Sequence, residues 1–325
     1  MRQPNHVMTV AAVLLVASLA SGNAQAQQDY PTKSMRLIVP FAPGGGTDIV
    51  ARLLAQKVSE GFRQTVIVDN RAGGGGTIGA ETAVRATPDG YTVIMMSGSY
   101  ATNAAMFKLP YDPVNDILPM GLVGDTAFLI ALHPAVPIKS VGELIAFLKA
   151  KPGALNYGSS GTGGIAHLSG ELFDLLAATK MTHVPYKGNT PAMTALMSGE
   201  VALVFDPVLT SMPMVKSGRV RALAVTTARR SALLPDVPTV AEAGVKGYEA
   251  GNWFGIFAPA GTPREIVARV NEAINKAMTR PEMKDKLASQ GADALTGSPA
   301  DLAALVQREL AKFAGIIKAA GVRVE

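Results

Sequence analysis

Two glycine-rich segments of the sequence combine flexible backbone with hydroxyl groups that could bind a small molecule. The first contains Pro43, Gly44, Gly45, Gly46, Thr47 and Asp48, and the second contains Gly158, Ser159, Ser160, Gly161, Thr162, Gly163 and Gly164. Each follows a strand-like apolar stretch and precedes a helical pattern. Backbone N–H groups at a helix start lack an intrahelical acceptor and can bind an anion. The two segments therefore predict an anion site, and the alternative is that their glycines only form tight turns.

The spacing of these residues excludes the common nucleotide and hydrolase motifs. A dinucleotide-binding fingerprint that begins at Gly44 needs glycine where Ile49 stands, and neither loop has the lysine of a Walker motif. A hydrolase elbow would need glycine in place of Thr162. His167 follows one turn into the next helical pattern and could pair with Ser160, but no acidic residue at a local spacing could orient it. We interpret His167 as a polar contributor to the site, and the alternative is a packing histidine.

Two further polar segments follow strand patterns and could select the ligand. Ser97, Ser99 and Thr102 lie in one polar run, which we interpret as a loop at the carboxyl end of a parallel strand. Ligands of α/β folds bind at such ends. Asp206 follows the apolar stretch Leu203–Phe205. Its carboxylate could accept a hydrogen bond from an amino or hydroxyl group of a ligand, or it could cap the next helix.

The composition excludes several kinds of site. The chain has 325 residues, is 48% hydrophobic and 17% charged, and has no cysteine. A cysteine nucleophile, a disulfide and a thiolate-bound metal are therefore excluded. Three histidines follow the first 26 residues without an H-E-x-x-H pattern, so we expect no metal and no cofactor. The net charge of +5 is spread along the chain, which argues against a nucleic-acid partner.

The N-terminus has the pattern of a secretory signal peptide. Residues 1–28 contain no acidic residue, Arg2 gives a positive start, and Val10–Ala20 is an apolar run. Ala24-Gln25-Ala26 fits the small-x-small cleavage rule, so we expect residues 1–26 to be removed after Ala26 and the rest to be periplasmic. The alternative is a membrane anchor, which the shortness of the run disfavours because a span needs about 20 residues.

Strand and helix patterns alternate along the rest of the chain, which is typical of an α/β fold with a mostly parallel sheet. We predict strands near residues 35–40, 65–69, 91–96, 155–157, 181–184, 203–205 and 221–226, and helices near 48–60, 77–86, 141–150 and 165–179. We also predict capping boxes at Ser140–Glu143 and Thr239–Glu242. The C-terminal segment is predicted to be helical, with starts at Thr262-Pro263 and Ser298-Pro299 and an end at Gly321.

Two long apolar stretches, Ile117–His133 and Asn252–Ala258, have no helix between their halves. We interpret them as strands that cross from one lobe to a second lobe and back, forming a hinge beside an interlobe cleft. One lobe would comprise residues 27–125 and 252–325, and the other residues 126–251. Such a shape suits a clamp for a small ligand and equally a two-domain enzyme.

The order of its motifs makes the chain resemble the Bug-type receptors of tripartite tricarboxylate transporters. The matching segments are Val39–Asp48, Val68–Gly79, Pro88–Thr92, Asn156–Gly163, Val184–Gly188, Arg221–Thr226, Leu234–Gly244 and Phe257–Pro263. The resemblance implies a two-lobe periplasmic binding protein fold of type II-like topology that closes on a small organic carboxylate. It also implies that the two glycine-rich loops hold the carboxylate from opposite lobes, and that an integral-membrane permease receives the ligand.

We therefore expect a monomeric solute-binding receptor without enzymatic activity. The alternatives are a sensor that reports the ligand to a signalling partner and a secreted hydrolase that uses Ser160 and His167. If the loops bind the anion, Gly45→Val and Gly161→Val should each abolish binding. Ser160→Ala should weaken it by about tenfold to a hundredfold, since one hydrogen bond to a charged group is worth about 1.5–3 kcal/mol.

Overall fold

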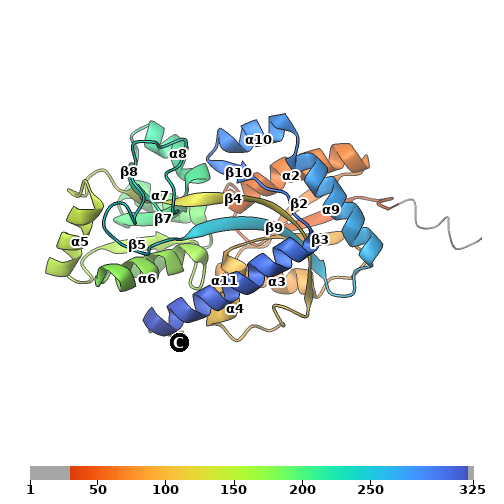
Figure 1. The fold of residues 1–325 in the computed structure, drawn as a ribbon, viewed down its shortest axis with the longest axis horizontal. Coiled ribbons are helices and arrows are strands. Elements are labelled where there is room, and N and C mark those ends of the chain that lie inside the picture. Colours follow the sequence, from red (N-terminus) through yellow and green to blue (C-terminus); the bar gives the residue numbers. More distant parts are fainter. Residues whose placement is uncertain (1–29, 321–325) are drawn as a thin grey trace, which may run out of the picture.

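The computed structural model describes residues 30–320, which form one curved sheet with helices on both of its faces (Figure 1). The strands are β1 (Met35–Val39), β2 (Val66–Asn70), β3 (Thr92–Ser97), β4 (Ile117–Leu132), β5 (Asn156–Ser159), β6 (Thr182–Pro185), β7 (Leu203–Pro207), β8 (Arg221–Val225), β9 (Gly251–Pro259) and β10 (Ala292–Ala294). The helices are α2 (Gly46–Phe62), the short 3-10 turn η1 (Gly74–Gly76), α3 (Thr77–Val84), α4 (Ser99–Met106), α5 (Val141–Ala150), α6 (Ile165–Ala177), α7 (Asn189–Ser198), α8 (Val208–Lys216), α9 (Arg264–Met278), α10 (Pro281–Ala288) and α11 (Pro299–Ala320). The predicted signal peptide and the helix end at Gly321 lie outside the described residues.

The strand order is β2-β1-β3-β9-β4-β7-β5-β6, with β8 and β10 also paired to β4. Strands β1, β2 and β3 are parallel to one another, and so are β5, β6 and β7. Between these groups, β4 runs antiparallel to β9 over Ile117–Ala127 and then pairs with β7 and β8 over Phe128–Leu132. The long pair of β4 and β9 through the middle of the molecule (Figure 1) confirms the two predicted crossing strands.

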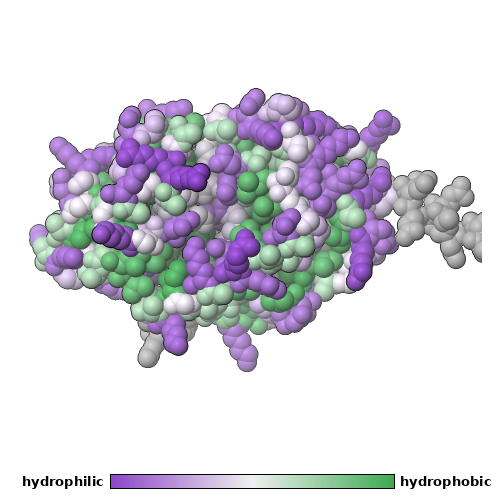
Figure 2. Space-filling model, in the orientation of Figure 1, coloured by the Kyte–Doolittle hydropathy of each residue, from purple (hydrophilic) through white to green (hydrophobic). Residues whose placement is uncertain are grey.

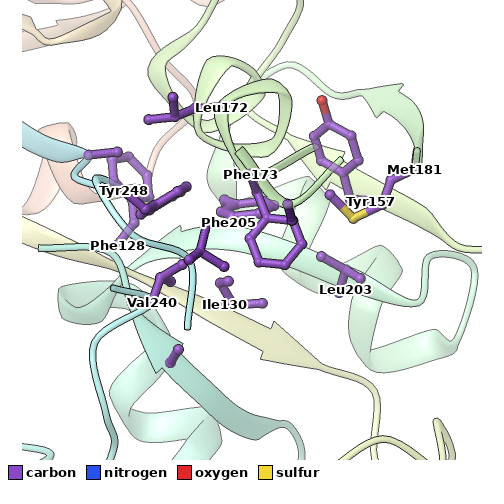
Figure 3. Packing of buried hydrophobic residues seen from close by; sticks show 14 of the residues in the cluster. Phe128, Ile130, Tyr157, Leu172, Phe173, Met181, Leu203, Phe205, Val240 and Tyr248 are labelled. Carbon is purple, nitrogen blue, oxygen red and sulfur yellow. The ribbon is translucent and has the colours of Figure 1, made fainter. Parts of the chain in front are cut away.

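Separate apolar clusters fill the two ends of the sheet. Around β1 and β3, the cluster includes Val39, Leu54 of α2 and Ile274 of α9. Around β7, Phe205 packs with Phe173 of α6, as Figure 3 shows. Burying a side chain of this size contributes about 1.5–3 kcal/mol. Each end of the sheet therefore has its own core beneath its own helices.

Helix α11 is a third element that spans both ends. Leu302 and Val306, near its start, belong to the cluster around Trp253. Phe313, two turns later, is buried in the cluster that contains Phe173. The single helix therefore packs against both halves, alongside β4 and β9 (Figure 1).

Three sequence predictions about local structure need correction. The run after β3 is the helix α4 instead of a loop. At Thr239, the predicted capping hydrogen bonds with Glu242 form at 3.0 Å, but only a turn follows them. At Thr262, the hydroxyl donates to the Pro259 carbonyl oxygen, so α9 begins one residue later than predicted. The predicted helix start at Ser298 is confirmed. The predicted cap at Ser140 also forms, with Glu143 accepting from the Lys139 N–H, one residue before Ser140.

None of the helices within residues 30–320 is both long and apolar enough to cross a bilayer. Hydrophilic residues are spread over both halves of the face drawn in Figure 2, with smaller apolar areas between them.

Candidate functional site

The first glycine-rich loop joins β1 to α2 and is held in place by Asp48. The carboxylate of Asp48 accepts hydrogen bonds from the Gly44 N–H and Arg52 Nε, both at 2.9 Å, and from Asn70 Nδ2 at 2.9 Å. Burial alone would raise the pKa of Asp48, but these hydrogen bonds and the charge of Arg52 outweigh it and hold the pKa below its ordinary value. Asp48 therefore acts as a charged brace inside the loop.

Helix α2 begins in this loop without a side-chain cap. The backbone N–H groups of Gly46, Thr47 and Asp48 have no acceptor among the hydrogen bonds of residues 30–320. All three residues are buried. The loop therefore presents a set of N–H donors at the positive end of the helix, as an anion site requires.

The second glycine-rich loop joins β5 to α6 and is braced by two histidines. Ser159 Oγ lies 2.6 Å from His183 Nε2 and accepts a hydrogen bond from the Gly161 N–H. The Gly163 N–H donates to His167 Nδ1 at 3.2 Å. The N–H groups of Gly161 and Gly163 are thus used within the loop. Those of Ser160 and Thr162 have no acceptor in the described part of the chain.

The two histidine rings stack with their centroids 4.0 Å apart, and Tyr157 of β5 packs against both. Burial, together with the charge of Lys180, lowers the pKa of His167 to about 4. Burial and the neighbouring His167 lower the pKa of His183 to about 3. Both rings are therefore neutral near pH 7, with Nδ1 of His167 free to accept from the loop.

The structure does not form the nucleophile–base pair that a hydrolase would need. No hydrogen bond joins Ser160 to His167 among the described residues, because His167 Nδ1 already accepts from the loop backbone. The expectation that no acidic residue lies at a local spacing was wrong, because Glu171, four residues later, lies 3.7 Å from His167 Nε2. The Glu171 Oε1 accepts a hydrogen bond from the Tyr157 hydroxyl. Only 5% of the His167 surface is exposed, so its ring supports the loop from the buried side.

Each glycine-rich loop lies at the junction between the halves of the sheet, where it contacts an element of the opposite half. A methyl group on Gly46 would lie 3.3 Å from Pro207, and one on Gly161 would lie 3.1 Å from the Gly75 backbone. The Thr190 hydroxyl donates to the Pro43 carbonyl oxygen at 3.1 Å. The loop Pro43–Asp48 therefore lies against β7 and α7, and the loop Ser159–Gly163 lies against η1.

Helix α4 contributes hydroxyl groups to this junction. Ser99 Oγ accepts from the Ile165 N–H at 3.1 Å, and the Thr102 hydroxyl donates to the Gly163 carbonyl oxygen. Ser97, at the end of β3, is buried, and its hydroxyl has no partner in residues 30–320. The same is true of the hydroxyls of Thr47 and Ser160. These three hydroxyls are therefore available to a ligand, whereas Ser99 and Thr102 are used to join the halves.

Asp206, at the end of β7, is buried and engages the first turn of α8. Its Oδ2 accepts hydrogen bonds from the Thr210 and Ser211 hydroxyls, at 2.5 and 2.6 Å. Its Oδ1 has no partner among the described residues. Burial raises the pKa of Asp206 to about 6, although the Ser211 and Thr210 hydroxyls and the Asn189 side chain oppose that rise. The carboxyl group therefore combines features of both sequence interpretations, since it binds the helix start and keeps one oxygen free.

Sequence reasoning missed several residues that complete the site. Asn103 donates to the Gly75 carbonyl oxygen at 2.9 Å, and its own Oδ1 is buried without a partner in the described chain. His183 had no predicted role, because nothing in its local sequence marks it as the partner of Ser159. Gly75 could have been found, since its glycine run follows a parallel strand next to β1. No group of three or more potential metal ligands occurs within the described residues.

Comparison with known proteins identifies the family. The model of the tripartite tricarboxylate transporter family receptor matches residues 50–322. The chain is 34% identical over 299 residues to the protein BugT of Bordetella pertussis, covering 91% of this chain and 92% of that protein. It is 38% identical over 314 residues to a protein from the TAR-I ttuE-ttuC' intergenic region of Agrobacterium vitis, covering 95% and 91% respectively.

Solved structures of related proteins have the same fold. Rpa4515 of R. palustris with adipate has a TM-score of 0.88 and 39% identity, over 91% of this chain and 99% of that one. The periplasmic binding protein BugD has a TM-score of 0.87 and 34% identity, over 91% and 100%. MatC of Rhodopseudomonas palustris with bound malate has a TM-score of 0.85 and 33% identity, over 89% and 100%. The chain has the two-lobe fold of these periplasmic binding proteins and belongs to the tripartite tricarboxylate transporter receptor family, as a Bug-type solute-binding receptor.

Proposed function

We propose that this receptor captures a small organic carboxylate between its two glycine-rich loops and delivers it to an integral-membrane permease. The observation that carries this proposal is the set of N–H groups at the start of α2 and in the loop before α6 that have no acceptor within residues 30–320. The adipate and malate bound to two relatives support a carboxylate as the ligand class.

In this proposal the anion is held by neutral donors. Gly46 and Thr47 donate backbone N–H groups from one loop, and Ser160 and Thr162 donate from the other. The hydroxyls of Thr47, Ser97 and Ser160 add further donors. A hydrogen bond to a charged group contributes about 1.5–3 kcal/mol, so four or five suffice for micromolar affinity, which needs about 8 kcal/mol.

The other predicted site residues would not contact the carboxylate of the ligand themselves. Asp48 and Gly44 fix the first loop, and His167 fixes Gly163 in the second. We propose that Asp206 selects ligands, because its free oxygen can accept a hydrogen bond from a ligand hydroxyl or amino group. Replacing Asp206 with asparagine should then change which carboxylates bind, more than it changes the stability of the fold.

We propose that β4 and β9 form the hinge between lobes comprising residues 27–125 with 252–325 and residues 126–251. A ligand that contacts both loops favours the closed arrangement. The packing of α11 against both clusters implies that the helix must slide or bend when the lobes open. Small-angle scattering with and without ligand tests this, and a ligand-free protein with the closed radius of gyration would contradict it.

The mature protein is proposed to be a non-catalytic periplasmic monomer that starts at Gln27. The neutral histidines and the absence of a Ser160–His167 hydrogen bond among the described residues support binding without turnover. Intact-mass analysis of the exported protein tests cleavage after Ala26, and light scattering tests the monomer. Loss of substrate in a long incubation, abolished by Ser160→Ala, would instead favour the hydrolase.

The central experiment is mass spectrometry of the small molecules released when the purified protein is denatured. We expect an organic acid in near-equal amount with the protein, because a closed receptor retains its ligand. Calorimetry with that acid should then give micromolar or tighter affinity for the wild type and weaker affinity for Ser160→Ala. An exclusively cationic or neutral ligand would overturn the proposed anion site.

A further inference from the structure

A groove of about 540 Å³ runs along the contact between η1 and the second glycine-rich loop. One side is lined by Gly74, Gly75, Thr77, Ile78 and Phe107–Pro110, and the other by Gly161-Thr162 and Pro185–Lys187. The backbones of Gly75 and Gly161, which line it from opposite sides, approach closely enough that a methyl group on Gly161 would lie 3.1 Å from Gly75. The groove is therefore complete only when η1 and the second glycine-rich loop lie against one another.

The walls of the groove are mainly apolar. Ile78 is 52% exposed, one of the few large apolar side chains with so much exposure among the described residues. Phe107, Leu109 and Tyr186 add further apolar and aromatic surface. A cavity of this size and lining matches the volume and character of ordinary small-molecule sites, which are mostly apolar with a few polar groups.

Two lysines give the groove a positive charge. Lys108 and Lys187 both line it and are exposed. Neither forms an ion pair with an acidic residue within residues 30–320. The nearby Glu200 accepts a hydrogen bond from the Tyr186 hydroxyl at 2.7 Å. Two unpaired ammonium groups beside apolar walls are complementary to an anion with an apolar body.

This chemistry differs from that of the cleft between the loops. The cleft offers backbone N–H groups and hydroxyls, which suit a compact polar acid. The groove offers apolar area and formal positive charge, which suit an aromatic or branched aliphatic acid. We propose that the groove is a second binding site, which takes an amphipathic organic acid beside the proposed carboxylate site and shares Gly161 and Thr162 with it.

Calorimetric titration of the mature protein with 2-naphthoate tests this second site. In the double variant Lys108→Ala/Lys187→Ala, we expect the affinity to fall at least tenfold. The matched control Lys284→Ala/Lys286→Ala removes two exposed lysines from α10, far along the chain from the groove, and should stay within twofold of the wild type. All four lysines are exposed, so the fold should tolerate these changes. Circular dichroism checks that it does.

The variant Ser160→Ala separates the groove from the cleft. Because Ser160 does not line the groove, its replacement should leave 2-naphthoate binding within twofold while weakening the acid found in the cleft. If 2-naphthoate binding survives the lysine changes but falls in Ser160→Ala, the probe binds in the cleft. The second site would then be wrong, and the proposed function would stand. The absence of measurable binding by the wild type at millimolar probe would also overturn the proposal.

Discussion

The two glycine-rich loops are held in shape by different sets of side chains. Pro43–Asp48 is braced by a carboxylate that collects hydrogen bonds from the loop, from Arg52 and from Asn70. Ser159–Gly163 is braced by a neutral pair of stacked histidines, one on α6 and one on β6. The first support depends on an ionised group and the second on unprotonated rings.

In the proposed anion site, this difference lets both loops avoid repelling a carboxylate without using a positively charged side chain to bind it. In the first loop, the negative charge of Asp48 is taken up by Arg52 and by two neutral donors, so the remaining N–H groups still face the cleft. In the second loop, a charged histidine would be an attractive partner for a carboxylate, yet burial keeps both rings neutral. In the proposed site, both loops would therefore present dipoles to the ligand in place of fixed positive charge.

The largest effect should come from alanine at Gly161 compared with alanine at Gly45. Gly161 has φ +131°, and a methyl group there would press on Gly75 at 3.1 Å. We expect Gly161→Ala to weaken ligand binding by about a hundredfold or more. Gly45 has an ordinary φ of −77° and room for a methyl group, so Gly45→Ala should change binding less than about threefold.

Calorimetry on these two variants makes the comparison, with circular dichroism as a check on folding. In the first loop, substitution should therefore be tolerated less well at Gly46 than at Gly45, because a methyl group on Gly46 would lie 3.3 Å from Pro207. Equal losses in Gly45→Ala and Gly161→Ala would show that the loops respond to general disruption and would contradict this assignment.

The next largest effect should come from Asp48→Asn, which removes the charge of the first brace but keeps its shape. An asparagine can accept fewer of the three hydrogen bonds and leaves a buried donor unsatisfied. We expect a loss of about 2–3 kcal/mol in the free energy of unfolding. His183→Gln is the matched change in the second loop. Because glutamine can still bond Ser159, it should cost less, about 1 kcal/mol.

Urea denaturation of both variants measures this difference. The expected order, with Asp48→Asn the less stable, follows from the charged character of the first support. A larger loss in His183→Gln would show that the histidine stack, and not the Asp48 network, is the stronger support.

A smaller effect is expected from single hydroxyl groups. Ser160→Ala removes a donor that has no partner in the described chain, so folding should be unaffected. Ligand binding should weaken by about tenfold, as one hydrogen bond to a charged group implies. Ser99→Ala is the control from the junction. Its hydroxyl oxygen already accepts from the Ile165 N–H, so its loss should lower binding mainly by hindering closure. Calorimetric titration of Ser160→Ala and Ser99→Ala at the same temperature compares their affinities for the ligand.

The sequence predicted the crossing strands and the two loops, because apolar runs and glycine clusters are local signals. It did not predict α7 or α8. Helix α7 contains Pro191 near its start and α8 contains Pro213, so local propensity opposed both helices. The sequence also predicted a loop where α4 forms, because Ser99 and Thr102 are poor helix formers and their hydroxyls bond Ile165 and Gly163, which are distant in the sequence. Such long-range contacts cannot be found in one sequence.

The smallest expected effect is the pH dependence of stability between pH 7 and pH 6. The folded pKa values of His167 and His183, about 4 and about 3, lie below the ordinary value of 6.5. The unfolded chain therefore binds more protons in this range, and these histidines make the protein less stable as the pH falls. Asp206 acts in the opposite direction, since its folded pKa of about 6 lies above 3.8 and the folded protein takes up its proton first. Asp48, whose pKa is lowered, contributes only near and below pH 4.

Burial and the charge of Asp293 likewise raise the pKa of Asp125 to about 6, so Asp125 acts in the same direction as Asp206. Two histidines against two aspartates leave a net loss of roughly 0.7 kcal/mol from pH 7 to pH 6. Urea denaturation at the two pH values measures it. The variant Asp206→Asn removes one of the opposing groups, so its loss should be larger than that of the wild type. The double variant His167→Gln/His183→Gln removes the source of the loss and should become slightly more stable at the lower pH. A wild-type loss that persists unchanged in the double variant would mean that the second loop does not depend on neutral histidines, and the contrast between the two loops would fail.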